Sequence, residues 1–304
     1  EGKEKRNTKV RRGKGDKRKN LRRDAVVTTH FTFNPTARTP EEMLKILMKE
    51  HTELEKLKQK DQKKESALKG ELPPRKPINK HVHAAMDGKV NAFKRLADQV
   101  ARRNPRLDKK IIVLIDGASS LENRFKEEMQ ERKWSKRVDA YILDIFHATE
   151  YLWDASTSLY GENSSERIVW VREKLLAILQ GKVGRVTGGL KQILKKDKRD
   201  LRAGQKKALQ TVITYFNNHK HMMRYNEYLQ KGYPIGTGVV EGACGCLVKD
   251  RTDRSGMKWS REGAQAILNL RAIKQNGDWD KYFAYYAQME SKRLYEGNIP
   301  AYVT

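Results

Sequence analysis

Two apolar runs that each end in an aspartate decide the fold: IIVLIDG at residues 111–117 and VDAYILD at residues 138–144. The first run is apolar on both faces, which is typical of a central strand covered on both sides. Between the two runs, the amphipathic pattern of residues 121–134 predicts a helix. The sequence therefore predicts a mixed α/β sheet in which Asp116 and Asp144 each follow a strand.

The residues before this pair extend the same pattern. The β-branched and aromatic stretch at 25–33 predicts a strand, and residues 81–86 predict a weaker one. Thr39-Pro40-Glu41-Glu42 has the residues preferred at a helix start, with Thr at the N-cap, Pro at the first position and Glu at the third. Residues 91–103 have apolar side chains at helical spacing.

The residues after Asp144 are helical in pattern as far as about residue 231. This block separates the predicted sheet from a glycine-rich turn at 234–238 and from helices that follow it. We predict an α-helical insertion at 148–231, within a core formed by residues 24–147 and 232–294, with a tail at 295–304.

The chain is strongly basic. Its 304 residues have a formal net charge of +26, and residues 1–23 hold twelve Lys or Arg against three acids. Such an excess attracts polyanions, and a segment with few apolar residues is typical of a solvated arm that orders on nucleic acid. We expect phosphate contacts from Arg11, Arg12, Lys17, Arg18, Lys19, Arg22 and Arg23. A charge that serves only solubility is the alternative.

The bulk composition excludes other classes. There is no run of 18 apolar residues, so no membrane span is expected. The basic amino terminus lacks the apolar region of a signal peptide. The two cysteines, Cys244 and Cys246, form no disulfide framework and suit a reducing interior, and a zinc site is not favoured. We expect a cytoplasmic protein.

Three acidic residues are candidates for chemistry. Asp116 follows a buried strand, where open α/β sheets bind ligands. Asp144 lies three residues before His147, so the two share a helix face if a helix begins there. Glu241 lies among glycines, GTGVVEG at 236–242. Carboxylates at strand ends and on a distant helix can hold two divalent metals for phosphoryl transfer. Helix capping and favourable charge at a helix start are the structural alternatives.

Several motifs resemble one family. GYPIGTGVVEGAC at 232–244, LVKDR at 247–251 and EGAQA at 262–266 are similar to the glutamate region of bacterial insertion-sequence transposases of the ISKra type. AVVT at 25–28, ARRNP at 101–105, GMKW at 256–259 and NGDW at 276–279 extend the resemblance to nearly the whole chain. Such proteins are similar to the wider Mutator-like group of DDE transposases.

This resemblance implies an RNase H-like core that carries a helical insertion, and DNA cleavage and strand transfer with two Mg²⁺ ions, or Mn²⁺. Asp116 would be the second metal-binding aspartate and Glu241 the last metal ligand. Asp144 and His147 match a Cys/Asp-x-x-His signature. We expect DNA backbone contacts from Lys249, Arg251 and Arg254. The partners implied are transposon ends and target DNA, with RNA and a homo-oligomer also open. The resemblance also implies a bacterial protein associated with the nucleoid.

One element of the family pattern is not found in the sequence. The first catalytic aspartate belongs to a strand that precedes the basic segment, and no strand is predicted before Asp24. Asp87, in Asp87-Gly88-Lys89, resembles the missing motif but follows the wrong strand. We therefore expect an amino-terminally truncated transposase. The alternatives are a catalytically dead nucleic-acid-binding derivative, or a subunit that another chain completes.

Overall fold

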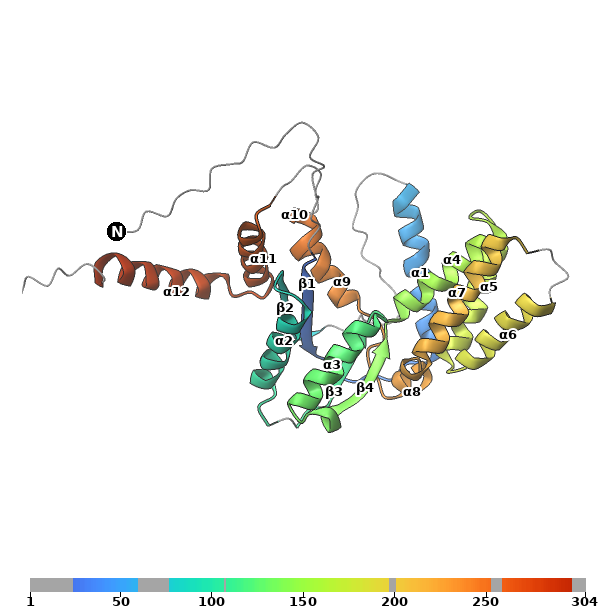
Figure 1. The fold of residues 1–304 in the computed structure, drawn as a ribbon, viewed down its shortest axis with the longest axis horizontal. Coiled ribbons are helices and arrows are strands. Elements are labelled where there is room, and N and C mark those ends of the chain that lie inside the picture. The colour runs from blue at the N-terminus through green and yellow to red at the C-terminus, as the bar shows by residue number, and fades with distance from the viewer. Residues whose placement is uncertain (1–23, 60–76, 107, 197–200, 253–258, 297–304) are drawn as a thin grey trace, which may run out of the picture.

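The computed structural model describes residues 24–59, 77–106, 108–196, 201–252 and 259–296, and it is a mixed α/β protein in which helices predominate (Figure 1). The two sheets lie in the middle of the molecule, a helical unit lies on one side, and two carboxyl-terminal helices lie on the other.

The strands form two pairs. Strand β1 (Val26–Thr32) is antiparallel to β2 (Ile78–Ala85), and β3 (Ile111–Ile115) is parallel to β4 (Val138–Leu143). All four strands lie where the sequence predicts them, but the prediction of one mixed sheet differs from the structure. In the described part of the chain, no strand joins β1 to β3, so the pairs remain separate sheets.

Helices cover these strands. Helix α2 (Lys89–Arg103) packs against β1 and against α3 (Ser119–Glu131), which connects β3 to β4 through a short 3-10 turn, Ser135–Arg137. This parallel crossover through a helix is the connection that a βαβ unit requires.

The predicted helical block is present. It contains α4 (Ile145–Tyr160), α5 (Ser165–Leu179), α6 (Val183–Lys196), α7 (Ala203–His219) and, after a 3-10 turn at Lys220–Met222, α8 (Tyr225–Gln230). Apolar side chains from all five helices share one core with β3 and β4.

Helix α1 (Pro40–Gln59) joins this helical unit. It begins with the predicted capping box: the Thr39 amide donates to Glu42 Oε2 at 2.8 Å, and the Glu42 amide donates to Thr39 Oγ1 at 3.1 Å. Met43, Leu44 and Leu47 are buried in the same core as α5. The helical unit therefore includes α1, which lies before the predicted insertion in the sequence.

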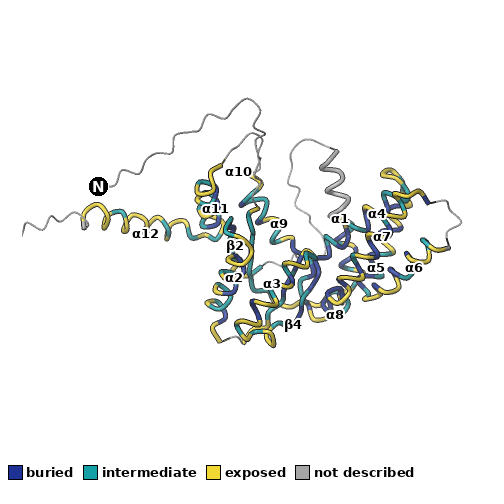
Figure 2. The backbone as a smooth tube through the Cα atoms, viewed as in Figure 1, coloured by how far each residue is buried: buried dark blue, intermediate teal, exposed yellow. Residues whose placement is uncertain are grey.

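After the helical unit, α9 (Gly238–Cys244) continues through a π-helical turn (Gly245–Lys249) into α10 (Asp250–Thr252). Helix α11 (Arg261–Gln275) then packs against β2, and α12 (Trp279–Ser291), followed by a π turn at Lys292–Glu296, extends away from the body (Figures 1 and 2). Among the described helices, none has both the length and the apolar composition needed to cross a bilayer.

Candidate functional site

Asp116 occupies a turn that the helical unit holds in place. Its Oδ1 accepts a hydrogen bond from the Ala118 amide at 2.9 Å, and its side chain is exposed. The Tyr215 hydroxyl, from α7, donates to the backbone oxygen of Asp116 at 3.1 Å, and His219 Nε2 lies 2.7 Å from the Gly117 oxygen. The turn after β3 is therefore fixed by two side chains that lie about a hundred residues further along the chain.

Gly117 is required by this turn. Its φ angle is +91°, and a Cβ at this position would lie 2.5 Å from the Tyr215 hydroxyl and 2.9 Å from Leu143 Cδ1. Other residues rarely adopt such a φ. The close approach at Gly117 is thus to α7 and β4.

Asp144 is fully buried at the end of β4, where it caps α4. Its Oδ1 accepts from the Phe146 amide at 3.0 Å and from the Thr237 amide at 3.2 Å, and its Oδ2 accepts from the Thr237 hydroxyl. Burial raises the pKa of this carboxyl, while the hydrogen bonds from Thr237 and Phe146 act in the opposite direction. Asp144 therefore fastens the loop before α9 and has little capacity left for a metal.

His147 lies one turn into α4 and is half-buried. Its Nδ1 is 3.1 Å from Glu150 Oε2, so its hydrogen-bond partner is Glu150 and not Asp144. Burial lowers the pKa of His147, but the Glu150 hydrogen bond and the charges of Asp144, Glu150 and Asp116 outweigh it, and the pKa is raised. The ring is therefore biased toward the cationic form beside three carboxylates.

Glu241 lies in the first turn of α9 and is exposed. Partial burial of the carboxyl raises its pKa, and the negative charges of Asp144 and Glu150 add to this effect, whereas His147 and Lys249 oppose it. Glu241 is thus within electrostatic range of the end of β4 and the start of α4, although 97 positions separate it from Asp144 in the numbering.

The site brings the predicted residues to one edge of the β3–β4 pair. Asp116 and Glu241 are exposed. The charge of Asp116 contributes to the raised pKa of His147 and of Tyr215. The charge of Glu241 contributes to the raised pKa of Cys244. Within the described residues, no three His, Cys, Asp or Glu side chains are arranged to hold a metal ion together.

The donor chemistry nevertheless suits a hard cation. Mg²⁺ takes oxygen ligands, keeps several waters and is commonly held by one or two carboxylates. Asp116 and Glu241 both supply exposed carboxylate oxygens. The pair therefore fits Mg²⁺ or Mn²⁺ in ligand type.

The glycines near Glu241 are of two kinds. A Cβ on Gly236 would lie 2.6 Å from the Phe146 ring, so this glycine permits close packing of the loop on α4. A Cβ added to Gly238, Gly242 or Gly245 would meet no atom within 4 Å, so these three glycines border open space. Among these four glycines, only Gly236 packs closely against another part of the chain.

The basic candidates are only partly described. Lys249 and Arg251 are exposed after α9. The others lie outside the described residues: Arg254 and, in the amino-terminal segment, Arg11, Arg12, Lys17, Arg18, Lys19, Arg22 and Arg23.

Two other aspartates flank β1 and β2: Asp24 precedes β1 and Asp87 follows β2. Asp87 forms a two-point ion pair with Arg95, at 2.5 and 2.6 Å, and the hydrogen bond from Arg95 lowers the pKa of Asp87. Asp24 is exposed before β1.

Sequence reasoning missed four residues of the site. Thr237 anchors Asp144, Glu150 pairs with His147, and Tyr215 and His219 hold the Asp116 turn. The spacing of Tyr215 and His219 places them one turn apart on α7, which is the available signal, but nothing in the sequence connects that helix to β3.

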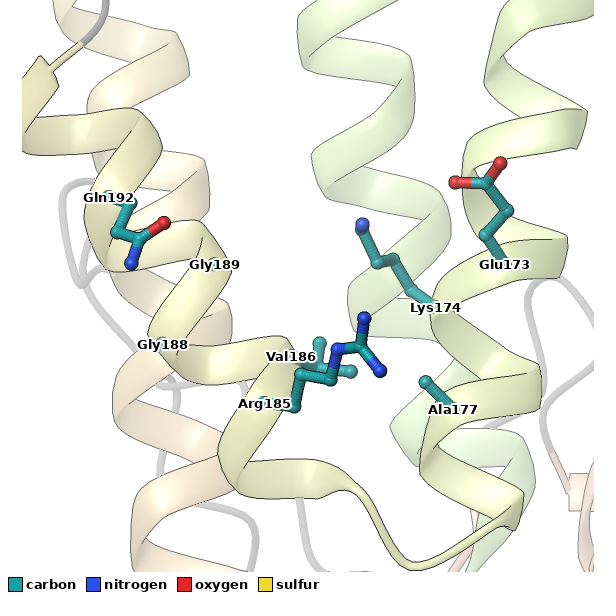
Figure 3. A pocket seen from close by; sticks show the side chains of 8 residues that line it. All are labelled: Glu173, Lys174, Ala177, Arg185, Val186, Gly188, Gly189 and Gln192. Carbon is teal, nitrogen blue, oxygen red and sulfur yellow. The ribbon is translucent and has the colours of Figure 1, made fainter.

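A hollow lies in the helical unit. It has a volume of about 560 Å³ and lies between α5, which contributes Glu173 and Lys174, and α6, which contributes Arg185 and Gln192 (Figure 3). None of the acidic candidates lines it.

No protein-family model, curated protein or solved structure matches the chain.

Proposed function

We propose that the chain is the catalytic portion of a DDE-type DNA transposase with an RNase H-like core, which cleaves and rejoins DNA with divalent metal. One observation carries the proposal: carboxylates from the end of β3 and from α9 belong to one acidic cluster around His147, in a chain with net charge +26. Carboxylates and the phosphates of DNA repel each other, so an acidic cluster that acts on DNA needs divalent cations bound between the two.

Asp116 and Glu241 would hold the metal in this proposal. Bound there, Mg²⁺ would activate the attacking oxygen and stabilise the leaving oxygen of the phosphodiester. Asp144 would be a positioning residue, because the hydrogen bonds that it accepts from Thr237 fix the loop before α9, the helix that carries Glu241.

His147 would bind the scissile phosphate. Its raised pKa keeps a larger fraction of the ring protonated near neutral pH, so its N–H groups can donate to a phosphate oxygen. Glu150 orients the ring through Nδ1, which leaves Nε2 for the substrate.

Lys249 and Arg251 would contact the DNA backbone beside Glu241. Open space next to Gly242 and Gly245 leaves room for a strand of nucleic acid on the same segment. The amino-terminal basic segment would add phosphate contacts that carry no sequence information.

A catalytically dead nucleic-acid-binding protein is the second candidate. The observation that favours it is that the described residues contain no three-ligand group for a metal. This candidate predicts salt-sensitive DNA binding without metal-dependent cleavage.

A cleavage assay separates the two. The chain is incubated with labelled duplex DNA and Mg²⁺ or Mn²⁺, and nicking and strand transfer are measured. We expect metal-dependent products that Asp116→Asn and Glu241→Gln each reduce at least 100-fold, while Asp154→Asn, an exposed aspartate on α4, has no effect. Tight DNA binding with no cleavage under any metal would instead support the dead derivative or a chain completed by another polypeptide.

A further inference from the structure

Helix α12 stands apart from the rest of the described chain. None of its side chains is buried, its main contact outside its own π turn is with α11, and it extends away from the body (Figures 1 and 2). An isolated helix shorter than about 12–15 residues is only marginally stable in water, and α12 has 13 residues. A partner that covers one face would stabilise it.

One face of α12 carries large apolar side chains. Trp279, Tyr282, Tyr286 and Met289 recur at alternating spacings of three and four residues, which is the pattern of a coiled-coil seam, and Phe283 lies beside them. The ring of Trp279 contacts that of Phe283 at 4.8 Å between centroids, and Tyr282 stacks on Tyr286 at 6.2 Å. These five residues form one stripe, which we call the α12 stripe.

The stripe remains open to solvent. Trp279, Phe283, Tyr286 and Met289 keep between 40% and 48% of their surface exposed. An aromatic side chain buries about 150–250 Å² when it is fully covered, so five residues that are about half exposed offer on the order of 500 Å² per copy. Two such stripes would bury about 1,000 Å² together, which is the size at which a specific interface becomes stable.

The segment that carries the stripe is electrically neutral. Residues 279–296 hold three acids and three bases, so the net charge of +26 belongs to the rest of the chain. A nucleic-acid surface has an excess of Lys and Arg, and this segment has none. Two copies of so basic a chain repel each other, and this repulsion is weakest where a neutral segment of one meets a neutral segment of the other.

The centre of the stripe is complementary to itself when two copies of α12 run in opposite directions. With Tyr286 opposite Tyr286 of the second copy, Phe283 lies opposite Met289. Aromatic rings favour contact with a tyrosine ring and with a methionine sulfur. The antiparallel direction also places the positive end of each helix dipole beside the negative end of the other.

The ends of the stripe match in the same register. Trp279 lies opposite Arg293 of the second copy, and Tyr282 lies opposite Glu290. Within one chain, Glu290 Oε2 accepts from Arg293 Nε at 3.0 Å and from Nη2 at 2.8 Å, which leaves the flat face of the guanidinium for the indole ring. A parallel pair would instead bring each charge against the same charge.

We propose that α12 is a self-association surface, on which a second copy of this chain docks its own α12 antiparallel, in the register centred on Tyr286. The interface is symmetric, because each copy presents the same stripe to the other. The proposal concerns association and not cleavage, so it does not depend on the proposed function.

The first test measures the association of the 304-residue chain by sedimentation velocity in high salt, which screens its net charge. We expect a monomer–dimer equilibrium in the micromolar range, as befits an interface of small area. Tyr286→Glu brings two like charges together at the centre of the pair and should raise the dissociation constant at least 100-fold. Gln288→Glu adds the same charge on the opposite face of α12 and should change it less than threefold.

A second test establishes direction and register by disulfide cross-linking with copper–phenanthroline in air, in a chain whose Cys244 and Cys246 are replaced by alanine. A mixture of Phe283→Cys and Met289→Cys chains should give at least tenfold more cross-linked dimer than either variant alone. In the antiparallel pair, two copies of the same position lie about 9 Å apart along the axis. This separation exceeds the Cα–Cα limit of about 7 Å for a disulfide.

Several outcomes would overturn the proposal. A chain that stays monomeric up to high micromolar concentration has no such interface, and a dimer that tolerates Tyr286→Glu associates elsewhere. Cross-linking of each cysteine variant with itself would show a parallel pair. In a monomeric chain, slow amide exchange in α12 would show that another segment of the same chain covers it. Weaker binding of DNA by Tyr286→Glu than by Gln288→Glu, again in a monomer, would identify nucleic acid as the occupant.

Discussion

Asp144 and Thr237 are joined by two hydrogen bonds, from the Thr237 amide and hydroxyl to the two carboxylate oxygens of Asp144. The contact ties the end of β4 to the loop that precedes α9. The adjacent bond from the Ile145 amide to the Ile235 oxygen, at 2.9 Å, reinforces it. The position of Glu241 relative to the end of β4 therefore depends on the buried contact between Asp144 and Thr237. In this contact the Asp144 carboxylate already accepts hydrogen bonds from the protein.

Loss of the Thr237 hydroxyl should destabilise the fold. Thr237→Val keeps the side-chain shape but leaves Asp144 Oδ2 without this donor, and an unsatisfied buried acceptor costs about 1–3 kcal/mol. Urea unfolding measures the loss. The control is Thr211→Val, an exposed helical threonine whose hydroxyl bonds to the Lys207 oxygen, which should change the free energy of unfolding by less than about 0.5 kcal/mol. Equal effects of both variants would contradict the anchoring role.

Substitution of Gly117 by alanine should lower the stability of the fold more than the same substitution of a glycine with a similar φ angle. Gly117→Ala combines a positive φ with contacts of 2.5 and 2.9 Å, whereas Gly161→Ala has φ +84° and no neighbour within 4 Å. We expect about 1–3 kcal/mol for Gly161→Ala from backbone strain alone, and a larger loss for Gly117→Ala. Thermal unfolding of the two variants gives the comparison, and equal losses would show that α7 yields to the added methyl group.

His147 should titrate above its ordinary value. Its pKa is raised despite burial, because Glu150 accepts its hydrogen bond and the charges of Asp144, Glu150 and Asp116 favour the imidazolium. Glu150→Gln should lower the midpoint of the His147 ring signals in an NMR titration. The exposed Glu173→Gln on α5 is the matched control and should leave the midpoint unchanged. A midpoint at or below the ordinary histidine value of 6.5 in the unsubstituted protein would contradict the described electrostatics.

Low pH should destabilise the β1–β2 pair because His30, on β1, becomes protonated. Burial, and then the charges of His81 and Arg103, lower the pKa of His30 from 6.5 to about 4. A lowered folded-state pKa means that the unfolded chain binds more protons between about pH 6.5 and 4, so stability is full above about pH 6.5 and falls toward about pH 4. With allowance for partial exposure, the loss is on the order of 1–2 kcal/mol.

Unfolding free energies measured from about pH 7 to about pH 4 test this dependence. His30→Gln should make the profile shallower in this window, because the titrating group is gone. His221→Gln, at an exposed site outside the sheets, should retain the slope that His30 contributes. An unchanged profile for His30→Gln would rule out His30 as its source.

Removal of either exposed carboxylate should weaken metal binding without unfolding the chain. We expect Asp116→Asn and Glu241→Gln each to lower Mn²⁺ affinity at least tenfold, as measured by electron paramagnetic resonance of free Mn²⁺. Asp154→Asn is again the control. Unchanged affinity in both site variants would remove Asp116 and Glu241 as metal ligands, whatever the result of the cleavage assay.

Much of the local structure follows from the sequence because local rules determine it. The capping residues Thr39 and Glu42 form the bonds that their spacing predicts, and the apolar run at 111–115 is a strand. The prediction of one sheet differs from the structure because strand order depends on contacts between distant segments. Periodicity identifies β1 and β3 as strands but does not indicate what lies between them.

The sequence by itself determined the four strands, the helical block and three acidic candidates, since hydrophobic periodicity and capping act over a few residues. Only the tertiary structure showed that Asp144 accepts hydrogen bonds from Thr237, that His147 pairs with Glu150, and that α7 holds the Asp116 turn. It also showed that β1 and β3 both line one groove. These features depend on the packing of segments that lie far apart along the chain, which no local pattern encodes.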